Sequence, residues 1–192
     1  PFFLYYSFIT PHAGGIGTNV ETGVPYPRDR IPSRFESYTR PDQGYASAVE
    51  GIDRTIGIVL DRLGGLDLLQ DNKTLVIFTS DNGPHVEGFH SARTFKSSGP
   101  FKGTKRSVHE GGIRVPMIVS WPGRINTNES TRDDTVGFVD ILPTLAQVAN
   151  LTHELPENID GHSFLPSLLG EERPQASSTF MYHEYCAPLE YN

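Results

Sequence analysis

The chain has 192 residues and a net charge of −7, and 36% of its residues are hydrophobic, to which 19 glycines are added. This composition is that of a globular protein of one domain or most of one, and the acidic balance disfavours nucleic acid as a partner. No apolar run approaches the roughly 18 residues that a membrane span needs. We therefore expect a soluble chain that binds no nucleic acid and has no membrane span.

Cysteine and sequon usage bear on the compartment. The single cysteine, Cys186, excludes an internal disulfide and a zinc site made of several cysteines. Three Asn-x-Ser/Thr sequons begin at Asn72, Asn128 and Asn150, and such triplets fit a secreted glycoprotein, although they also arise by chance. The sequons favour the secretory route.

The first expected element is a strand at residues 2–9, which are apolar apart from Ser7 and lie between Pro1 and Pro11. A continuous apolar run of this length indicates a strand buried on both faces. The run has no initial methionine and no basic residues, so it is not a signal peptide, and we expect a fragment whose beginning is missing. Residues 13–43 show no period and are expected to form a long loop.

A helix is expected at residues 44–63, where apolar residues recur at intervals of three and four and two glycines follow. A second buried strand is expected at 75–79, and it runs into the adjacent Asp81 and Asn82. Asp-Asn-Gly is ordinary turn chemistry. Two neighbouring oxygen donors at the end of a strand also fit a metal site. Both interpretations are open on these residues alone.

Residues 83–112 hold many glycines, histidines and basic side chains without periodicity, and a loop of this length favours a functional role. Between Arg93 and Arg114 six basic residues meet one acid, Glu110, so this window carries +5 and the remainder of the chain −12. A basic island in an acidic protein indicates a local anion site, with a solvated loop as the alternative.

A third strand is expected at 115–121, and a helix at 137–150 with Pro143 in its first turn. Strands that alternate with helices predict an α/β fold with a mostly parallel sheet flanked by helices. We expect residues 1–170 to form the later part of this α/β domain. Residues 171–192 are expected to begin a smaller C-terminal α+β subdomain.

Four stretches carry a family resemblance: PFFLYYSFITPH, LVIFTSDNGPH, GPFKGTKRSVHEGGIRVPMIVSWPG and DILPTLAQVAN. In this order they resemble the middle and later parts of the type-I sulfatases, the formylglycine-dependent members of the alkaline-phosphatase superfamily. The most specific pattern is Lys-x4-Glu-Gly-Gly-Ile/Val-Arg, here Lys105 to Arg114. The resemblance implies an alkaline-phosphatase-like fold, truncated here, and hydrolysis of sulfate monoesters.

The resemblance also implies roles at the matching positions. Asp81 and Asn82 match two ligands of a calcium ion, and all-oxygen ligation suits Ca²⁺, or alternatively Mg²⁺, rather than a soft metal. Lys105 matches a lysine that contacts the sulfate oxygens. His12 matches a histidine that hydrogen-bonds an oxygen or protonates the leaving alcohol. The implied partner is a sulfated small molecule or glycan.

Other residues compete for these roles. Lys102 is a second candidate lysine, but its distance from the Glu-Gly-Gly motif is wrong. His85 and His90 are close together, yet no third ligand follows at a zinc spacing, and their roles stay open between substrate pocket and structure. Glu110 and Arg114 are expected to brace the loop by pairing with each other.

The family's nucleophile motif, Cys or Ser followed by x-Pro-x-Arg, does not occur in the sequence. Residues 30–34 have arginine at the nucleophile position, and residues 186–190 have glutamate in place of the arginine. We therefore expect formylglycine in a missing N-terminal segment, and no sulfatase activity from the fragment alone. The alternatives are a phosphoryl hydrolase of the same superfamily and a non-catalytic binder of sulfated glycans.

Overall fold

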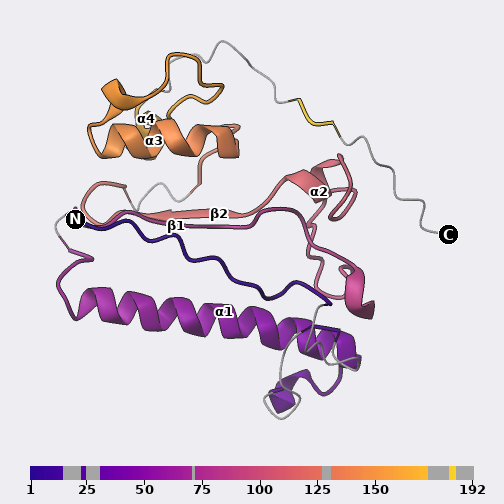
Figure 1. The fold of residues 1–192 in the computed structure, drawn as a ribbon. Helices are drawn as coiled ribbons and strands as arrows, with labels where there is room; N and C mark the ends of the chain where they lie inside the picture. Colours follow the sequence, from indigo (N-terminus) through magenta and orange to yellow (C-terminus); the bar gives the residue numbers. More distant parts are fainter. Residues whose placement is uncertain (15–22, 25–30, 71, 127–130, 173–181, 185–192) are drawn as a thin grey trace. The chain divides into compact units, whose positions relative to one another are not determined.

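The computed structural model describes residues 1–14, 23–24, 31–70, 72–126, 131–172 and 182–184. The chain divides into two compact units (Figure 1). The first unit is made of residues 1–67, 77–118 and 184–192, and the second of residues 68–76 and 119–183. All four candidate site residues, His12, Asp81, Asn82 and Lys105, belong to the first unit.

The long helix α1, Arg40–Gly64, confirms the helix predicted at 44–63 and begins four residues earlier. The side chain of Thr39 caps its N-terminus by accepting from the backbone N–H of Asp42, and Pro41 occupies the first turn, where its missing N–H costs nothing. The apolar periodicity does not extend into this polar turn, so the prediction started late. A short helix, η2 at Ser33–Phe35, precedes it.

Two of the three predicted strands are present. Strand β1, Val76–Thr79, and strand β2, Met117–Ser120, pair with each other, and the hydroxyl of Thr79 donates to the carbonyl of Pro116 at 2.9 Å. They run antiparallel, because the segment between them turns the chain back on itself rather than crossing over the sheet (Figure 1). This one pair does not confirm the mostly parallel sheet, which stays a prediction.

The strand predicted at residues 2–9 is not formed. This segment makes no strand ladder among the residues that the structure describes, and large side chains along it are exposed, with Phe3 at 77% and Ile9 at 82%. Burial on both faces is also wrong for β2, where Ile118 is 62% exposed. An apolar run is buried on both faces only where neighbouring strands and helices cover it, and the described part of this unit does not supply them.

The second unit contains the helix predicted at 137–150, now divided into η4, Phe138–Asp140, and α3, Ile141–Val148. Pro143 lies in the first turn of α3, as predicted. The fully buried hydroxyl of Thr144 donates to the carbonyl of Asp140 and accepts from the N–H of Phe164. Two short helices follow, η5 at Thr152–Glu154 and α4 at Leu165–Leu168.

Several predictions fall largely on residues that the structure does not describe. These include nearly half of the loop at 13–43, most of the C-terminal subdomain at 171–192, the sequon at Asn128, and Cys186. Among the described helices, each is too short or too polar to cross a lipid bilayer.

Candidate active site

The site begins at the end of β1, where the chain leaves the strand at Asp81 and Asn82. The carboxylate of Asp81 is exposed, and Ser80 donates to it at 3.4 Å. The amide Nδ2 of Asn82 donates to the carbonyl of Gly83 at 2.9 Å, so its Oδ1 is the atom that it offers to a ligand. Two adjacent oxygen donors therefore stand at the carboxyl end of a strand.

The next three residues attach this turn to three other segments. The N–H of Gly83 donates to the carbonyl of Gly112 at 2.9 Å, and the carbonyl of Pro84 accepts from the N–H of Lys105 at 2.9 Å. The ring Nε2 of His85 donates to the carbonyl of Pro11 at 2.8 Å. This turn thus hydrogen-bonds to the backbone at or next to both predicted catalytic residues, Lys105 and His12.

The glycines of the Glu-Gly-Gly motif allow a close approach of backbone to backbone. They lie in the short helix α2, Glu110–Ile113, where a Cβ on Gly112 would come within 2.1 Å of the Ser107 carbonyl. A Cβ on Gly111 would come within 2.2 Å of the Gly103 carbonyl. The loop that carries Lys105 can therefore fold against α2 only because side chains are absent there.

His12 and Lys105 meet, although 93 positions separate them in the sequence. The Nζ atom of Lys105 lies 2.8 Å from Nε2 of His12, and Nδ1 of His12 lies 2.6 Å from the carbonyl of Ala13. A carbonyl oxygen only accepts, so Nδ1 carries the imidazole proton and Nε2 accepts from the lysine. Both side chains remain accessible, with His12 exposed and Lys105 half-buried.

The competing residues behave differently. Lys102 is exposed, and its backbone carbonyl accepts from the N–H of Gly111. Glu110 and Arg114 form an ion pair at 3.2 Å, which confirms that they pair with each other. Arg114 also lies 4.6 Å above the centre of the Phe101 ring. Lys105 is the lysine whose ammonium contacts His12.

A buried cluster that the sequence did not reveal lies behind the exposed pair. His85 and His90 are 6% and 4% exposed, and their rings meet edge to face at 4.5 Å. Tyr45 of α1 stacks on His90 at 4.2 Å. Burial lowers the pKa of His90, although its hydrogen bond to the carbonyl of Glu87 acts against this shift. Burial likewise raises the pKa of Tyr45. Both side chains are therefore held in their neutral forms.

Glu87 connects this cluster to the basic loop. It begins the short helix η3, Glu87–Phe89, and its carboxylate lies 2.7 Å from Nη1 of Arg106 and 3.2 Å from Nδ1 of His85. Partial burial acts to raise the pKa of this carboxyl, but its own backbone N–H and the nearby positive charges, chiefly Arg106, hold that pKa below its usual value. The carboxylate stays ionised and lies between Arg106 and the ring of His85.

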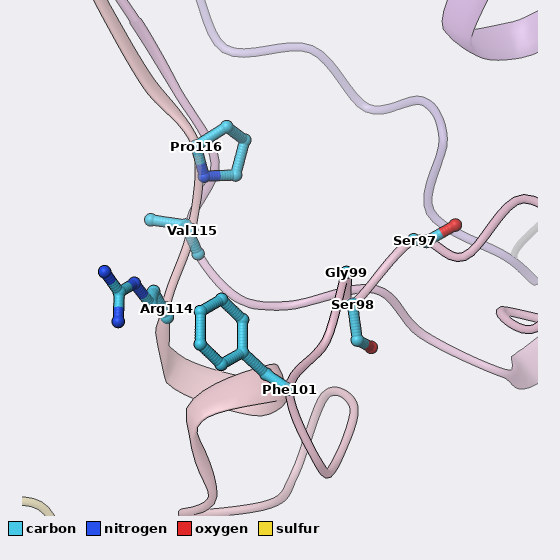
Figure 2. Close-up of a pocket in the computed structure, with 7 residues that line it drawn as sticks. All are labelled: Ser97, Ser98, Gly99, Phe101, Arg114, Val115 and Pro116. Carbon is cyan, nitrogen blue, oxygen red and sulfur yellow. The ribbon is translucent and has the colours of Figure 1, made fainter. Parts of the chain in front are cut away.

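The same unit contains a pocket of about 250 Å³. Figure 2 shows the residues that line it. Arg114 and the ring of Phe101 form one side of it, and none of the four predicted site residues lines it. The charge of Arg114 is already engaged by its ion pair and by the aromatic ring. The candidate active site is therefore defined by the contacts around His12 and Lys105 and not by this hollow.

A calcium ion suits the donor chemistry of Asp81 and Asn82, since both present hard oxygen atoms. Two ligands are fewer than the six to eight that Ca²⁺ takes. Among the described residues, no group of three or more His, Cys, Asp or Glu side chains is placed to hold a metal ion. These two residues could therefore be only part of a calcium site.

A comparison of the sequence with protein-family models shows the family of this chain. The family model described as Sulfatase matches residues 1–151, which is more than half of the chain. The chain therefore belongs to the sulfatase family. The resemblance inferred from the four ordered stretches is confirmed.

Curated relatives agree with this assignment. The chain is 41% identical to steryl-sulfatase of Rattus norvegicus, over 74% of the chain and 24% of that protein. It is 33% identical to arylsulfatase A of Homo sapiens, over 96% of the chain and 32% of that protein. It is also 33% identical to N-acetylgalactosamine-6-O-sulfatase of Bacteroides thetaiotaomicron, over 90% of the chain and 31% of that protein. The chain spans about a quarter to a third of the length of these relatives.

A solved structure shares the fold. The yidJ protein of Bacteroides fragilis, whose crystal structure is described as that of a candidate sulfatase, superposes with a TM-score of 0.54 at 26% identity. The match covers 76% of this chain and 30% of that one. The chain therefore has the fold of part of a sulfatase.

Proposed function

We propose that the protein containing this chain hydrolyses sulfate monoesters, with a calcium ion and a formylglycine nucleophile. The observation that carries the proposal is the contact at 2.8 Å between Lys105 and His12, which places two groups suited to a sulfate ester side by side. The same turn that presents Asp81 and Asn82 holds the backbone of both residues. A metal ligand pair, a cation and an imidazole thus lie within one connected set of segments.

The chemistry of the two side chains is complementary. In the free site Nε2 of His12 accepts from the ammonium of Lys105. A sulfate group bound between them would replace His12 as the acceptor of the Lys105 ammonium. The ammonium would then donate to the sulfate oxygens, where negative charge develops. An imidazole placed there can protonate the leaving alcohol through its Nε2. When bound, the calcium ion would supply further charge stabilisation to the sulfate oxygens.

We propose that the nucleophile lies in a part of the protein outside these 192 residues, together with the other metal ligands. The support is that the chain covers only part of each relative's length and contains no Cys-x-Pro-x-Arg motif. The chain expressed alone should then lack sulfatase activity and bind Ca²⁺ weakly. In the complete protein, residues 1–170 would belong to a mostly parallel α/β sheet, and residues 171–192 would begin a smaller subdomain.

The proposed substrate class is a sulfated small molecule or glycan. The relatives include a steryl-sulfatase, an arylsulfatase and an N-acetylgalactosamine-6-O-sulfatase, so their names span sterol, aryl and sugar sulfates. These have in common an anionic sulfate monoester and differ in the leaving alcohol. The proposed site would bind the sulfate monoester group that these substrates share.

The role of His12 predicts a dependence on the leaving group. In the full-length protein, His12→Ala should lower kcat/KM for an alkyl or sugar sulfate by about a hundredfold or more, the range of general acid catalysis. A nitroaryl sulfate should lose less than about tenfold, because its leaving group departs without protonation. Steady-state kinetics on the two substrates measures the difference. Equal losses would leave His12 with sulfate binding alone.

We also propose the secretory route, with Asn150 as a glycan acceptor. Asn150 follows α3, and both it and Thr152 are exposed. The side chain of Asn72 is engaged within the protein, because its amide, turned to the orientation that satisfies both of its polar atoms, donates through Nδ2 to the carbonyls of Pro122 and Gly123 at 3.2 and 3.1 Å. The hydroxyl of Thr74, which completes that sequon, is buried.

Secretion of the full-length protein from a eukaryotic cell should therefore place an N-linked glycan on Asn150 and none on Asn72. Glycopeptide mass spectrometry checks this, and Asn150→Gln should remove one glycan whereas Asn72→Gln should leave the glycan mass unchanged. A glycan found on Asn72 with none on Asn150 would contradict the assignment.

A further inference from the structure

The peptide unit between Pro11 and His12 is held at both ends. Its carbonyl, on Pro11, accepts from Nε2 of His85 at 2.8 Å, and its N–H, on His12, donates to the carbonyl of Ile9 at 3.2 Å. Fixing this peptide plane fixes the N–Cα bond of His12, from which its side chain extends. The imidazole of His12 itself is exposed.

His85 is itself held in place by the interior of the first unit. It is 6% exposed, and Tyr45 meets its ring edge to face at 5.7 Å. Its Nδ1 lies 3.2 Å from the carboxylate of Glu87, a close contact without hydrogen-bond geometry. Its ring also lies face to face with that of His12, with 6.0 Å between their centres. His85 therefore presents a fixed Nε2–H donor to the segment that carries His12.

Glu87 extends the same arrangement to the other member of the pair. Its carboxylate lies 2.7 Å from Arg106, the residue that follows Lys105. Arg106 has a φ of 72°, a left-handed conformation that residues other than glycine rarely adopt. His85 thus contacts the segment that carries His12, and Glu87 contacts the residue next to Lys105.

We propose that His85 is a positioning residue of this active site. Through its Nε2–H it holds the Pro11–His12 peptide so that the imidazole of His12 faces Lys105, and Glu87 keeps His85 aligned with the lysine-bearing loop. The inference rests on the proposed function, because the imidazole that it orients is the proposed proton donor. His85 touches no substrate in this account.

Steady-state kinetics of the full-length protein on an alkyl sulfate and on 4-nitrophenyl sulfate tests the proposal. His85→Ala should lower kcat/KM much more for the alkyl sulfate, the same dependence expected of His12→Ala. The double variant His12→Ala/His85→Ala should be no worse than His12→Ala, because residues acting through one group are non-additive. Equal losses on the two substrates, or additive losses, would overturn the proposal.

Two amide variants keep the test valid if His85→Ala folds poorly. A glutamine side chain places its Nε2 near that of histidine, so His85→Gln should restore most of the activity towards the alkyl sulfate. Asparagine is too short to reach Pro11, so His85→Asn should not. Equal activity of these two variants would contradict the positioning role.

His90 provides the matched control. It is buried in the same cluster and bonds to Glu87 rather than to the His12 segment. His90→Ala should lower stability and reduce activity on the two sulfates by the same factor. A larger loss on the alkyl sulfate would show that general loosening of the cluster, and not the Pro11 contact, governs His12.

A spectroscopic measurement separates this inference from the proposed function. The ¹⁵N chemical shifts of an imidazole report which ring nitrogen carries the proton. In the wild-type protein and in His85→Gln, His12 should show the Nδ1–H form, whereas His85→Ala should show an average of both forms. Failure of the wild-type protein to cleave any sulfate ester would sink the proposed function alone. Unchanged ¹⁵N shifts in His85→Ala would sink the positioning role.

Discussion

Replacing Asp81 by alanine in the full-length protein should abolish sulfate ester hydrolysis and weaken Ca²⁺ binding by more than about tenfold, a loss of 1.4 kcal/mol or more. The physical reason is that Asp81 is the charged member of the proposed ligand pair. A cation that loses a carboxylate keeps its cost of dehydration and gives up its strongest Coulombic partner. Calcium titration calorimetry measures the affinity directly.

Asp53→Ala is a matched control for this experiment, because Asp53 is an exposed acid on α1 in the same unit. It changes the net charge by the same amount without touching the end of β1. We expect it to leave both Ca²⁺ affinity and turnover close to wild type. Unchanged Ca²⁺ affinity in Asp81→Ala would remove Asp81 from the metal site, whatever the effect on activity.

Lys105→Ala should cost about 2 to 4 kcal/mol of transition-state stabilisation, in line with the loss of one preorganised donor at a developing charge. That is roughly a thirtyfold to thousandfold fall in kcat/KM. Lys102→Ala should cost little, because Lys102 is exposed and makes its contact to Gly111 through its backbone carbonyl. Both variants remove one lysine side chain and one positive charge from the same loop. A difference in kcat/KM between them therefore reports the position of the lysine and not the loss of charge. Equal losses in the two variants would overturn the choice of Lys105.

Local features of this chain could be predicted well from its sequence. The helix α1, the strands β1 and β2, and the place of Pro143 all follow from short-range periodicity and backbone chemistry. The pairing of Glu110 with Arg114 follows from their spacing on consecutive turns. These are interactions whose partners lie a few residues apart.

The predictions that failed depend on which other segments pack against an element, and not on the local sequence pattern. An apolar run such as residues 2–9 indicates that burial is favourable, but it cannot supply the layers that would bury it, and Phe3 and Ile9 remain exposed. A mostly parallel sheet was inferred from the alternation of strands and helices. It stays a prediction, because the sheet that the described residues form is one antiparallel pair, β1 with β2.

The site shows the same division. Its candidate residues came from a family pattern, and their contact at 2.8 Å between His12 and Lys105 could not be read from spacing. Glu87 and Tyr45 were missed altogether, since a glutamate after His-Val and a tyrosine in a helix carry no signal of their own. The contacts of Glu87 with His85 and Arg106 become visible only when two segments are brought together.

The most direct test of the proposed function is a comparison of 4-nitrophenyl sulfate with 4-nitrophenyl phosphate as substrates of the full-length protein, in the presence of Ca²⁺. The leaving group is the same, so the ratio of kcat/KM values reports only the transferred group. We predict a clear preference for the sulfate ester, lost together with Ca²⁺ binding in Asp81→Ala. A preference for the phosphate ester, or binding of sulfated glycans without turnover of either ester, would contradict the assignment of this protein as a sulfate ester hydrolase.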